Sequence, residues 1–229
     1  MTEYCVPAAA GEASFTEKRS EFLGHVRPVE SEEEARAFVA EMKKKYYDAR
    51  HNCWCYIIKD GPERYSDDGE PQGTAGIPML EVFRREGVCN VVCVVTRYFG
   101  GILLGAGGLL RAYTKSAKDA LDAAGISVVR RWVGTALDCS YAAAEKLKQE
   151  ITAFGGIVAG LDYGAAVTIH AYIPEESAED FKARIFDVSA GGVMVRNIVL
   201  FGVLIYGLIG PERVKIVLAE AGGIQPQGQ

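Results

Sequence analysis

The sequence VCNVVCVVTRYFGGILLGAGGLLRAY, residues 88–113, carries the strongest structural signal in the chain. Residues 88–98 are almost continuously apolar, which is typical of a strand buried on both faces. A glycine-rich turn follows, and we predict a helix over about 108–123 that ends at Gly125. The apolar stripe expected on this helix consists of Leu109, Leu110, Tyr113, Ala117 and Leu121.

The segments before this stretch alternate between predicted strands and one predicted helix. Residues 22–29 and 51–58 have strand-like composition, and a strand is also expected over 126–133. A helix is predicted after Ser31, because Ser31 and Glu34 have the spacing of a capping box. Its apolar positions are Ala35, Phe38, Val39 and Met42. Residues 59–76 are polar and rich in Gly and Pro, so we predict a long loop there.

The second half of the chain reads as a separate domain. After Gly134 we expect a strand at 135–141, a helix at 142–154, strands at 157–162 and 165–173, a helix at 175–187 and a strand within 193–206. This β-α-β-β-α-β order is that of a ferredoxin-like domain. A short helix is expected within 211–221. The sequence therefore predicts two domains, residues 1–134 and residues 135–229.

Composition and charge limit the classes of protein. The 229 residues are 49% hydrophobic and 24% charged, which excludes a disordered chain, a collagen or a coiled coil. Lys and Arg number 25 against 30 Asp and Glu, and most of the net charge of -5 lies in the second half. The first residues do not resemble a signal peptide, and no stretch is long enough to span a membrane. We therefore expect a cytoplasmic protein with six free thiols.

The segment YSDDGEPQGTAGIP, residues 65–78, places Asp67, Asp68 and Glu70 within four positions. Such a cluster suits a hard cation or a general acid or base, but the pattern favours an ordered structural or partner-docking loop whose Asp side chains cap backbone amides. Neighbouring carboxylates repel one another unless a cation lies among them. We therefore expect the loop to pack against residues 51–58, with Arg97 beside at least one of the three.

Two other patterns allow alternatives. His51, Cys53 and Cys55 share one face of a predicted strand, which fits zinc ligands or simply core packing; a fourth ligand is missing, and no metal is predicted. The glycine-rich turn lacks the Lys-Ser/Thr of a P-loop and a dinucleotide fingerprint, so no cofactor is predicted. Five basic residues form either a nucleic-acid-binding patch or a solvated surface: Arg111, Lys115, Lys118, Arg130 and Arg131.

Three motifs together resemble the IMPACT/YigZ family. They are His51-x-Cys53-x-x-Tyr56, Tyr65-Ser-Asp-Asp-Gly-Glu-Pro-x-Gly-Thr-Ala-Gly-x-Pro78 and Val95-Thr-Arg-Tyr-Phe-Gly-Gly-x-x-Leu-Gly105. The resemblance implies an α+β protein, in which a ribosomal-protein-type α/β two-layer domain precedes a ferredoxin-like domain similar to the last domain of elongation factor G. The candidate site that it implies comprises His51, Asp67, Asp68, Glu70, Thr74, Arg97, Tyr98, Gly100 and Gly101.

The resemblance also implies a function. Eukaryotic members control translation initiation under stress, and binding of bacterial members to nucleic acid or the ribosome is inferred from their folds. We therefore expect a non-enzymatic, translation-associated regulatory protein that binds RNA, the ribosome or a protein partner, with no catalytic residue and no membrane contact. The alternative is a hydrolase or metal-dependent enzyme that uses Asp67, Asp68 and Glu70 together with His51.

Overall fold

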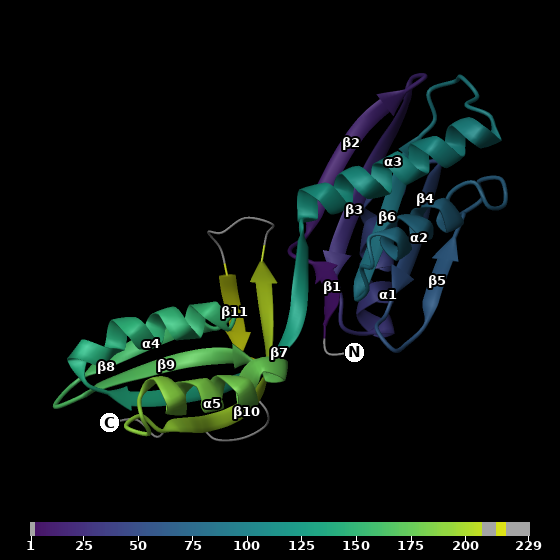
Figure 1. Ribbon diagram of the computed structural model, residues 1–229. Coiled ribbons are helices and arrows are strands. Elements are labelled where there is room, and N and C mark those ends of the chain that lie inside the picture. Colours follow the sequence, from purple (N-terminus) through teal and green to yellow (C-terminus); the bar gives the residue numbers. More distant parts are fainter. Residues whose placement is uncertain (1–2, 208–213, 219–229) are drawn as a thin grey trace, which may run out of the picture. The chain divides into compact units, whose positions relative to one another are not determined.

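The structure is a computed structural model that describes residues 3–207 and 214–218 (Figure 1). Backbone contacts divide the chain into an N-terminal unit, which contains Glu3–Val129, and a C-terminal unit, which contains Arg130–Ile205. Each unit has its own hydrophobic core. The domain boundary expected at Gly134 stays a prediction. No helix within the described residues is long and apolar enough to cross a membrane.

An antiparallel sheet of five strands forms the centre of the N-terminal unit, in the order β2-β3-β6-β4-β5. These strands are β2 (Gly11–Glu17), β3 (Ser20–Pro28), β6 (Val91–Tyr98), β4 (His51–Ile57) and β5 (Glu63–Ser66). The predicted apolar strand is therefore the central strand, β6. In the register of the sheet, Arg97 of β6 lies opposite Phe22 of β3 on one side and His51 of β4 on the other.

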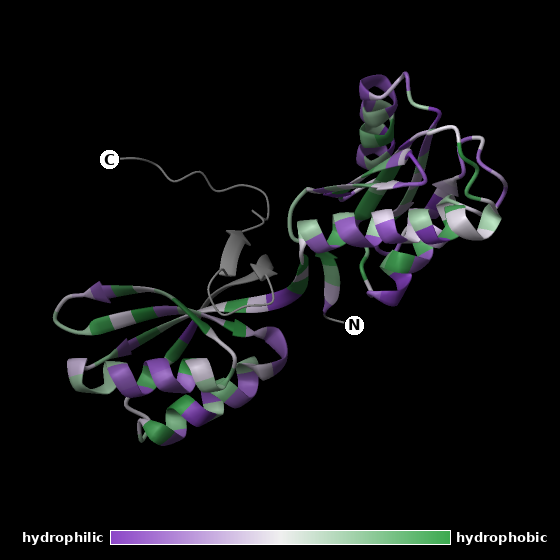
Figure 2. Cartoon of the chain, turned by 90° about the horizontal axis from the view of Figure 1, so that it is seen from above, coloured by the Kyte–Doolittle hydropathy of each residue, from purple (hydrophilic) through white to green (hydrophobic). Residues whose placement is uncertain are grey.

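Helices cover both faces of this sheet, as Figure 2 shows from above. Along β6, Cys93 and Val95 face α2 (Gly76–Arg85) and α3 (Ala106–Ala124), while Val92 and Val94 face α1 (Glu32–Lys45). The prediction that this strand is buried on both faces is confirmed. The mixed α/β class is also confirmed, and α1 adds a third layer to the two that were expected.

Local signals explain the helices that the sequence predicts. Ser31 caps α1, because its hydroxyl accepts a hydrogen bond from the Glu34 amide at 3.2 Å. The Glu34 carboxylate accepts from the amide of Glu30 at 2.8 Å, one residue before the partner expected in a capping box. On α3, one position of the expected apolar stripe is wrong: Leu110 is 45% exposed, and Ala112 is buried in the core instead.

Several elements of the N-terminal unit were not predicted. The segment 59–76 is not one loop, because β5 lies within it and pairs with β4, with Tyr65 opposite Cys55. The helix α2 begins at Gly76, the last residue of this segment. It was not predicted, because Gly76 and Pro78 are not typical of the start of a helix with no capping side chain before it. The chain also begins with the strands β1 (Tyr4–Pro7) and β2, for which we made no prediction.

The C-terminal unit has the strand order β10-β7-β9-β8 of a ferredoxin-like domain, followed by β11 beside β10. The elements that lie mainly in this unit are β7 (Ile126–Cys139), α4 (Tyr141–Ala153), β8 (Ile157–Tyr163), β9 (Val167–Pro174), the short 3-10 helix Glu175–Ser177, α5 (Ala178–Val188), β10 (Val195–Gly207) and β11 (Val214–Leu218). The strands expected at 126–133 and 135–141 are one strand, β7. The helix expected within 211–221 is wrong for Val214–Leu218, and 211–213 and 219–221 lie outside the described residues.

Two glycines let α3 rest directly on the backbone of the N-terminal sheet. A Cβ atom at Gly11 of β2 would lie 2.3 Å from the backbone nitrogen of Ala124, and one at Gly24 of β3 would lie 2.6 Å from the carbonyl oxygen of Ser116. These separations are far below van der Waals contact, so any side chain would push α3 away from the sheet.

We predict that Gly11→Ala lowers the free energy of unfolding by about 1–3 kcal/mol, because the added methyl group meets helix backbone that cannot rotate away. The measurement is urea denaturation followed by circular dichroism. Gly107→Ala is the control, because its nearest neighbour would be the Nη1 atom of Arg111 at 3.6 Å, the mobile end of a side chain. Equal stability of the two variants would contradict the close packing of α3.

Candidate functional site

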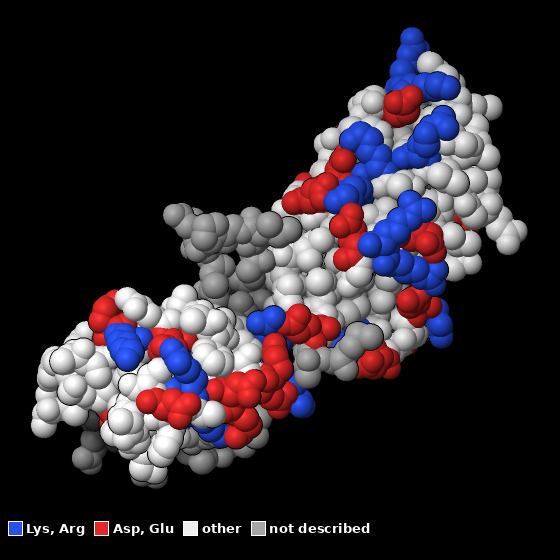
Figure 3. All heavy atoms as spheres, in the orientation of Figure 1, with Lys and Arg blue, Asp and Glu red and all other residues white. Residues whose placement is uncertain are grey.

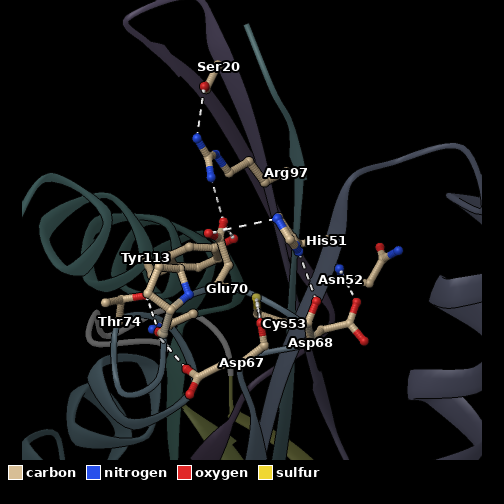
Figure 4. Close-up of polar contacts among 12 residues, drawn as sticks. Ser20, His51, Asn52, Cys53, Asp67, Asp68, Glu70, Thr74, Arg97 and Tyr113 are labelled. Atoms are coloured by element: carbon tan, nitrogen blue, oxygen red, sulfur yellow. Dashed lines mark hydrogen bonds and ion pairs between the residues drawn. The ribbon is translucent and has the colours of Figure 1, made fainter. Parts of the chain in front are cut away.

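Asp67 holds the beginning of α2 in place. Its Oδ1 atom accepts hydrogen bonds from the amides of Ala75 and Gly76 at 3.0 and 2.8 Å, and its Oδ2 atom accepts from the amide of Gly73 at 2.8 Å. These amides lie at the helix N-terminus, where backbone donors lack partners within the helix (Figure 4). The carboxylate of Asp67 therefore acts as a remote helix cap.

Asp68 fixes the same loop to the edge of α1 and β4. Its Oδ2 atom accepts from the amide of Asn52 at 2.7 Å, and its Oδ1 atom pairs with the Nζ atom of Lys43 at 2.6 Å. Its backbone adopts a φ of +44°, and the hydroxyl of Ser66 accepts a bond from its amide at 3.1 Å. Both aspartates of the cluster are thus engaged in ordering the loop.

Glu70 is the carboxylate that meets Arg97, in a buried pair at one end of β6. Their side chains are 3% and 5% exposed, and Oε1 of Glu70 lies 2.6 Å from Nη1 of Arg97. The hydroxyl of Tyr113, on α3, donates to the same oxygen at 2.8 Å. The guanidinium also donates to the hydroxyl of Ser20 at 3.4 Å. The prediction that Arg97 lies beside one of the three carboxylates is confirmed.

His51 lies next to this pair because β4 and β6 align it with Arg97. Its Nδ1 atom is 2.8 Å from the carbonyl oxygen of Asp68, and a carbonyl can only accept, so Nδ1 carries a proton. The other ring nitrogen, Nε2, faces the Oε2 atom of Glu70 at 3.8 Å. The backbone thus fixes the orientation of the imidazole and directs Nε2 toward the carboxylate (Figure 4).

Burial keeps the neighbouring thiol and phenol neutral. Desolvation raises the pKa of Cys53 well above its usual range, and its thiol donates to the carbonyl oxygen of Asp67 at 3.0 Å. Desolvation likewise raises the pKa of Tyr113, and the nearby groups of Cys53 and Glu70 add to the shift. A neutral buried thiol is a poor nucleophile, and the burial of Cys53 is consistent with core packing.

The second cysteine of this strand is a core residue as well. Burial also raises the pKa of Cys55, which packs in the core beside Cys93. Across the residues that the structure describes, no group of three or more His, Cys, Asp and Glu side chains could hold a metal ion. All six cysteines of the chain, which fall within those residues, are free.

The remaining residues of the implied site shape its surroundings. The hydroxyl of Thr74 donates to the carbonyl oxygen of Pro71 at 2.6 Å, and that of Tyr98 donates to Asp48 at 2.9 Å. Desolvation and this bond raise the pKa of Tyr98 to about 12. A Cβ atom at Gly100 would collide with the carbonyl oxygen of Arg19 at 1.9 Å, and Gly101 has a φ of +84° that favours glycine.

A cavity of about 540 Å³ opens beside the buried pair. Its polar lining includes His51, Glu70 and Arg97, and its apolar lining comes mainly from the segment 99–105 and the first turns of α3. The residues that line the cavity are Arg50, His51, Gly69, Glu70, Pro71, Arg97, Phe99, Leu103, Leu104, Gly105, Ala106 and Leu109. The structure thus brings three of the predicted site residues to one cavity and leaves Asp67 and Asp68 outside its lining.

The predicted basic patch is largely neutralised by neighbouring carboxylates. Lys115 pairs with Asp119, and Lys118 pairs with Asp122 and with Glu86. In the C-terminal part of the set, Arg130 lies 3.8 Å from Glu176 and Arg131 lies 3.7 Å from Glu175. Arg111 alone among the five has no ionic partner within the described residues.

Other cations gather at the end of the N-terminal unit that holds the cavity. Lys18 and Arg111 line a second, smaller hollow that shares Leu104 with the cavity, and Arg50 lines the cavity itself. Arg19 packs on Gly100. We call Lys18, Arg19, Arg50 and Arg111 the basic end. None of the four has a carboxylate partner in the described ranges, although Glu17 lines the same hollow as Lys18 and Arg111. Figure 3 shows basic side chains over α3 and the turn between β2 and β3.

Sequence reasoning missed Phe99, Arg50, Lys18 and Arg19. Phe99 lies inside the third motif, and an exposed aromatic between a strand and a glycine pair was a signal for it. The cations lie on separate segments, and nothing in the sequence links them. Tyr113 was assigned to the apolar stripe, whereas its hydroxyl takes part in the polar cluster.

Comparison with known proteins follows the same division of the chain. Residues 18–121 match the Impact N-terminal domain, and residues 137–191 match a domain of unknown function (DUF1949). The chain is 36% identical over 195 residues to IMPACT family member YvyE of Bacillus subtilis, covering 83% of this chain and 89% of that protein. A solved crystal structure of a hypothetical protein, 32% identical, covers 87% of this chain and 98% of its own, with a TM-score of 0.55.

The fold and the site define a protein with an Impact-type N-terminal domain followed by a ferredoxin-like domain. The chain belongs to the IMPACT family. The N-terminal part is also similar to Protein IMPACT of Mus musculus, which is 37% identical over 109 residues, or 45% of this chain and 34% of that protein.

We predict that Asp67→Ala lowers the free energy of unfolding by about 2 kcal/mol, because three amides at the start of α2 lose their acceptor. The measurement is urea denaturation at neutral pH. Asp122→Ala is the control, since Asp122 is exposed and pairs only at the surface of α3; it should change stability by less than about 0.5 kcal/mol. Equal effects of the two substitutions would contradict the capping role.

Alkaline pH should destabilise the N-terminal unit through Tyr113. Its pKa in the folded state lies above that of the unfolded chain, about 10, so its contribution is present below pH 10 and is lost as pH rises further. We expect Tyr113→Phe to flatten the fall of the urea midpoint between pH 9 and 11. The control Tyr47→Phe changes an exposed ring and should keep the wild-type profile; identical profiles for all three proteins would refute this assignment.

Proposed function

We propose that this protein is a non-enzymatic, translation-associated regulator whose N-terminal unit binds RNA through the basic end. The observation that carries the proposal is that Lys18, Arg19, Arg50 and Arg111 lie at one end of the unit, where Arg50 and the exposed Phe99 line the same cavity. Cations bind phosphate groups, and an exposed aromatic ring offers a surface on which a base stacks. The proposal places the protein in the cytoplasm, in contact with RNA or with the ribosome.

The charge distribution supports a local site. The chain as a whole carries a net charge of -5, so its overall field repels RNA. Cations that already pair with a carboxylate, such as Lys115 and Lys118, gain less from a phosphate because the existing pair must first be broken. The unpaired cations of the basic end are free of that cost. Binding is therefore expected there rather than along the whole face of α3.

The family supports the link to translation. The motifs of the N-terminal unit are those by which the chain resembles IMPACT proteins, and that resemblance implies a role in the control of translation initiation. The part that is similar to Protein IMPACT of Mus musculus makes up less than half of this chain. The Impact N-terminal domain at residues 18–121 contains all four cations of the basic end.

The contacts of the acidic loop favour binding over hydrolysis. Asp67 and Asp68 accept bonds from backbone amides and a lysine, which leaves them unavailable as acids or bases without loss of the local fold. Glu70 is held by Arg97 and Tyr113. His51 was the fourth residue named for the enzymatic alternative. Its Nδ1 atom is hydrogen-bonded, whereas its Nε2 atom has no hydrogen bond among the described residues.

The test is binding of a labelled single-stranded RNA of mixed sequence, measured by fluorescence anisotropy over a range of salt. We expect the double substitution Arg50→Glu and Arg111→Glu to weaken binding about tenfold or more at low salt and to flatten the log–log salt dependence by about 0.7 for each lost phosphate contact. The single substitution Arg111→Glu should keep part of this effect. Its control, Arg85→Glu, makes the same change of charge in the last turn of α2, before β6 begins, and should bind almost as the wild type does.

Equal weakening by Arg85→Glu would move the binding surface away from the basic end. An RNA that does not bind the wild-type protein, together with no co-sedimentation with ribosomes, would refute RNA binding and leave a protein partner as the ligand to seek.

A further inference from the structure

The cavity combines a polar floor with apolar walls. Glu70, Arg97 and His51 are nearly buried at its floor, and Phe99, Leu103, Leu104 and Leu109 supply most of its apolar lining. Its volume of about 540 Å³ lies within the range of pockets that bind small organic ligands. A ligand that fits must therefore bring hydrogen-bonding groups to the floor and an apolar surface to the walls.

The floor offers one carboxylate oxygen to a donor. The Oε1 atom of Glu70 already accepts from Arg97 and Tyr113, whereas Oε2 has only the Nε2 atom of His51 nearby, at 3.8 Å, in the described structure. That distance is too long for a hydrogen bond. An apolar ligand group in the cavity would exclude water from these two polar atoms without offering them a hydrogen bond, which is unfavourable. The floor therefore selects a ligand that carries a hydrogen-bond donor, such as an amino group.

The wall offers a ring for stacking. Phe99 is 47% exposed, and the guanidinium carbon of Arg97 lies 5.5 Å from the centre of its ring. The contact with Arg97 holds the ring in place while leaving about half of its surface open. Planar heteroaromatic groups stack on such rings, and the strength of stacking depends little on which base is stacked.

The mouth of the cavity suits an anion. Gly105 and Ala106, at the start of the 19-residue helix α3, belong to the lining. The first turn of α3 contains no acidic residue, and in the described structure no side chain caps it, so the amides of this turn lack an anionic partner. Arg50 lies at the same opening, held by the bond from its amide to the carbonyl oxygen of Arg97 at 3.1 Å.

We propose that this cavity takes one unstacked nucleotide of a bound RNA strand, selected for an exocyclic amino group on its base. The amino group donates to Oε2 of Glu70, the base stacks on Phe99, and the adjoining phosphate lies between Arg50 and the N-terminus of α3. Carboxylates recognise the amino group of cytosine in this way, whereas uracil presents a carbonyl oxygen at the same position. This inference rests on the proposed function, because the nucleotide belongs to the RNA held by the basic end.

Cytidine and uridine test the inference with bases of the same size. The probes are labelled C12 and U12 strands and a U12 strand with one central cytidine, and binding to the full chain is measured by fluorescence anisotropy. We expect C12 to bind at least about tenfold more tightly than U12, the effect of one hydrogen bond to a charged acceptor. One cytidine in U12 should recover most of this difference, because the cavity holds a single base.

Two variants separate the cavity from the basic end. Phe99→Ala should weaken binding of C12 about tenfold without changing the slope of its salt dependence, since a stacking contact releases no counterions. Ile102→Ala is the matched control, because Ile102 is also exposed in the segment 99–105 but does not line the cavity. Glu70→Gln should reduce the preference for cytidine, since an amide both donates and accepts.

The outcomes distinguish this inference from the proposed function. Equal affinities of the wild type for C12 and U12, or equal effects of Phe99→Ala and Ile102→Ala, would overturn the nucleotide site while the Arg50 and Arg111 effects still support RNA binding. No binding to any of the strands would overturn the proposed function and this inference with it. If Glu70→Gln does not fold, the comparison of C12 with U12 and the Phe99 variant still decide.

Discussion

A buried ion pair, Glu70 with Arg97, joins four parts of the N-terminal unit. The carboxylate comes from the loop before α2 and the guanidinium from the central strand β6, while Tyr113 of α3 donates to the carboxylate and the guanidinium donates to Ser20 of β3. Removal of one partner from such a pair leaves an unpaired buried charge, which typically costs about 3–5 kcal/mol. The position of the loop, the helix and the two strands at this end of the sheet depends on keeping both charges together.

The remaining polar groups of the loop make the same end rigid. Asp67 caps α2, Asp68 ties the loop to α1 and β4, and the carbonyl of Asp68 fixes the tautomer of His51. Because these bonds hold the loop from several sides, the cavity keeps its floor without a ligand. The acidic cluster is thus best understood as the support of a binding site, with Glu70 as the member that reaches the cavity.

Charge is distributed so that an acidic protein retains a basic surface. On α3, lysines lie four positions before aspartates and pair with them, which removes most of the charge that the helix would present. The cations of the basic end come from the turn before β3, the segment before β4 and the first half of α3. They therefore converge on the segment 99–105 and concentrate positive potential around the cavity.

Local sequence signals were sufficient to predict an element where the pattern of its own apolar residues shows which faces are buried. The nearly continuous apolar run of residues 88–98 and the apolar stripe of α3 predicted both elements, and Ser31 marked the start of α1. Repulsion among three carboxylates predicted that Arg97 approaches one of them. Segments that depend on distant partners were missed: β5 is stable because it pairs with β4, and α2 begins where Asp67, eight and nine residues before its capped amides, supplies the acceptor.

The sequence by itself determined the family, the order of the elements and the residue types available for a site, because motifs and periodicity are properties of consecutive residues. Only the tertiary structure decided that Glu70, rather than either aspartate, is the partner of Arg97, and that Lys118 is neutralised by Glu86, 32 positions away. It also decided that Arg50, Phe99 and the start of α3 enclose one cavity. Ion pairing and enclosure depend on distances in space, which chain folding sets and sequence spacing does not.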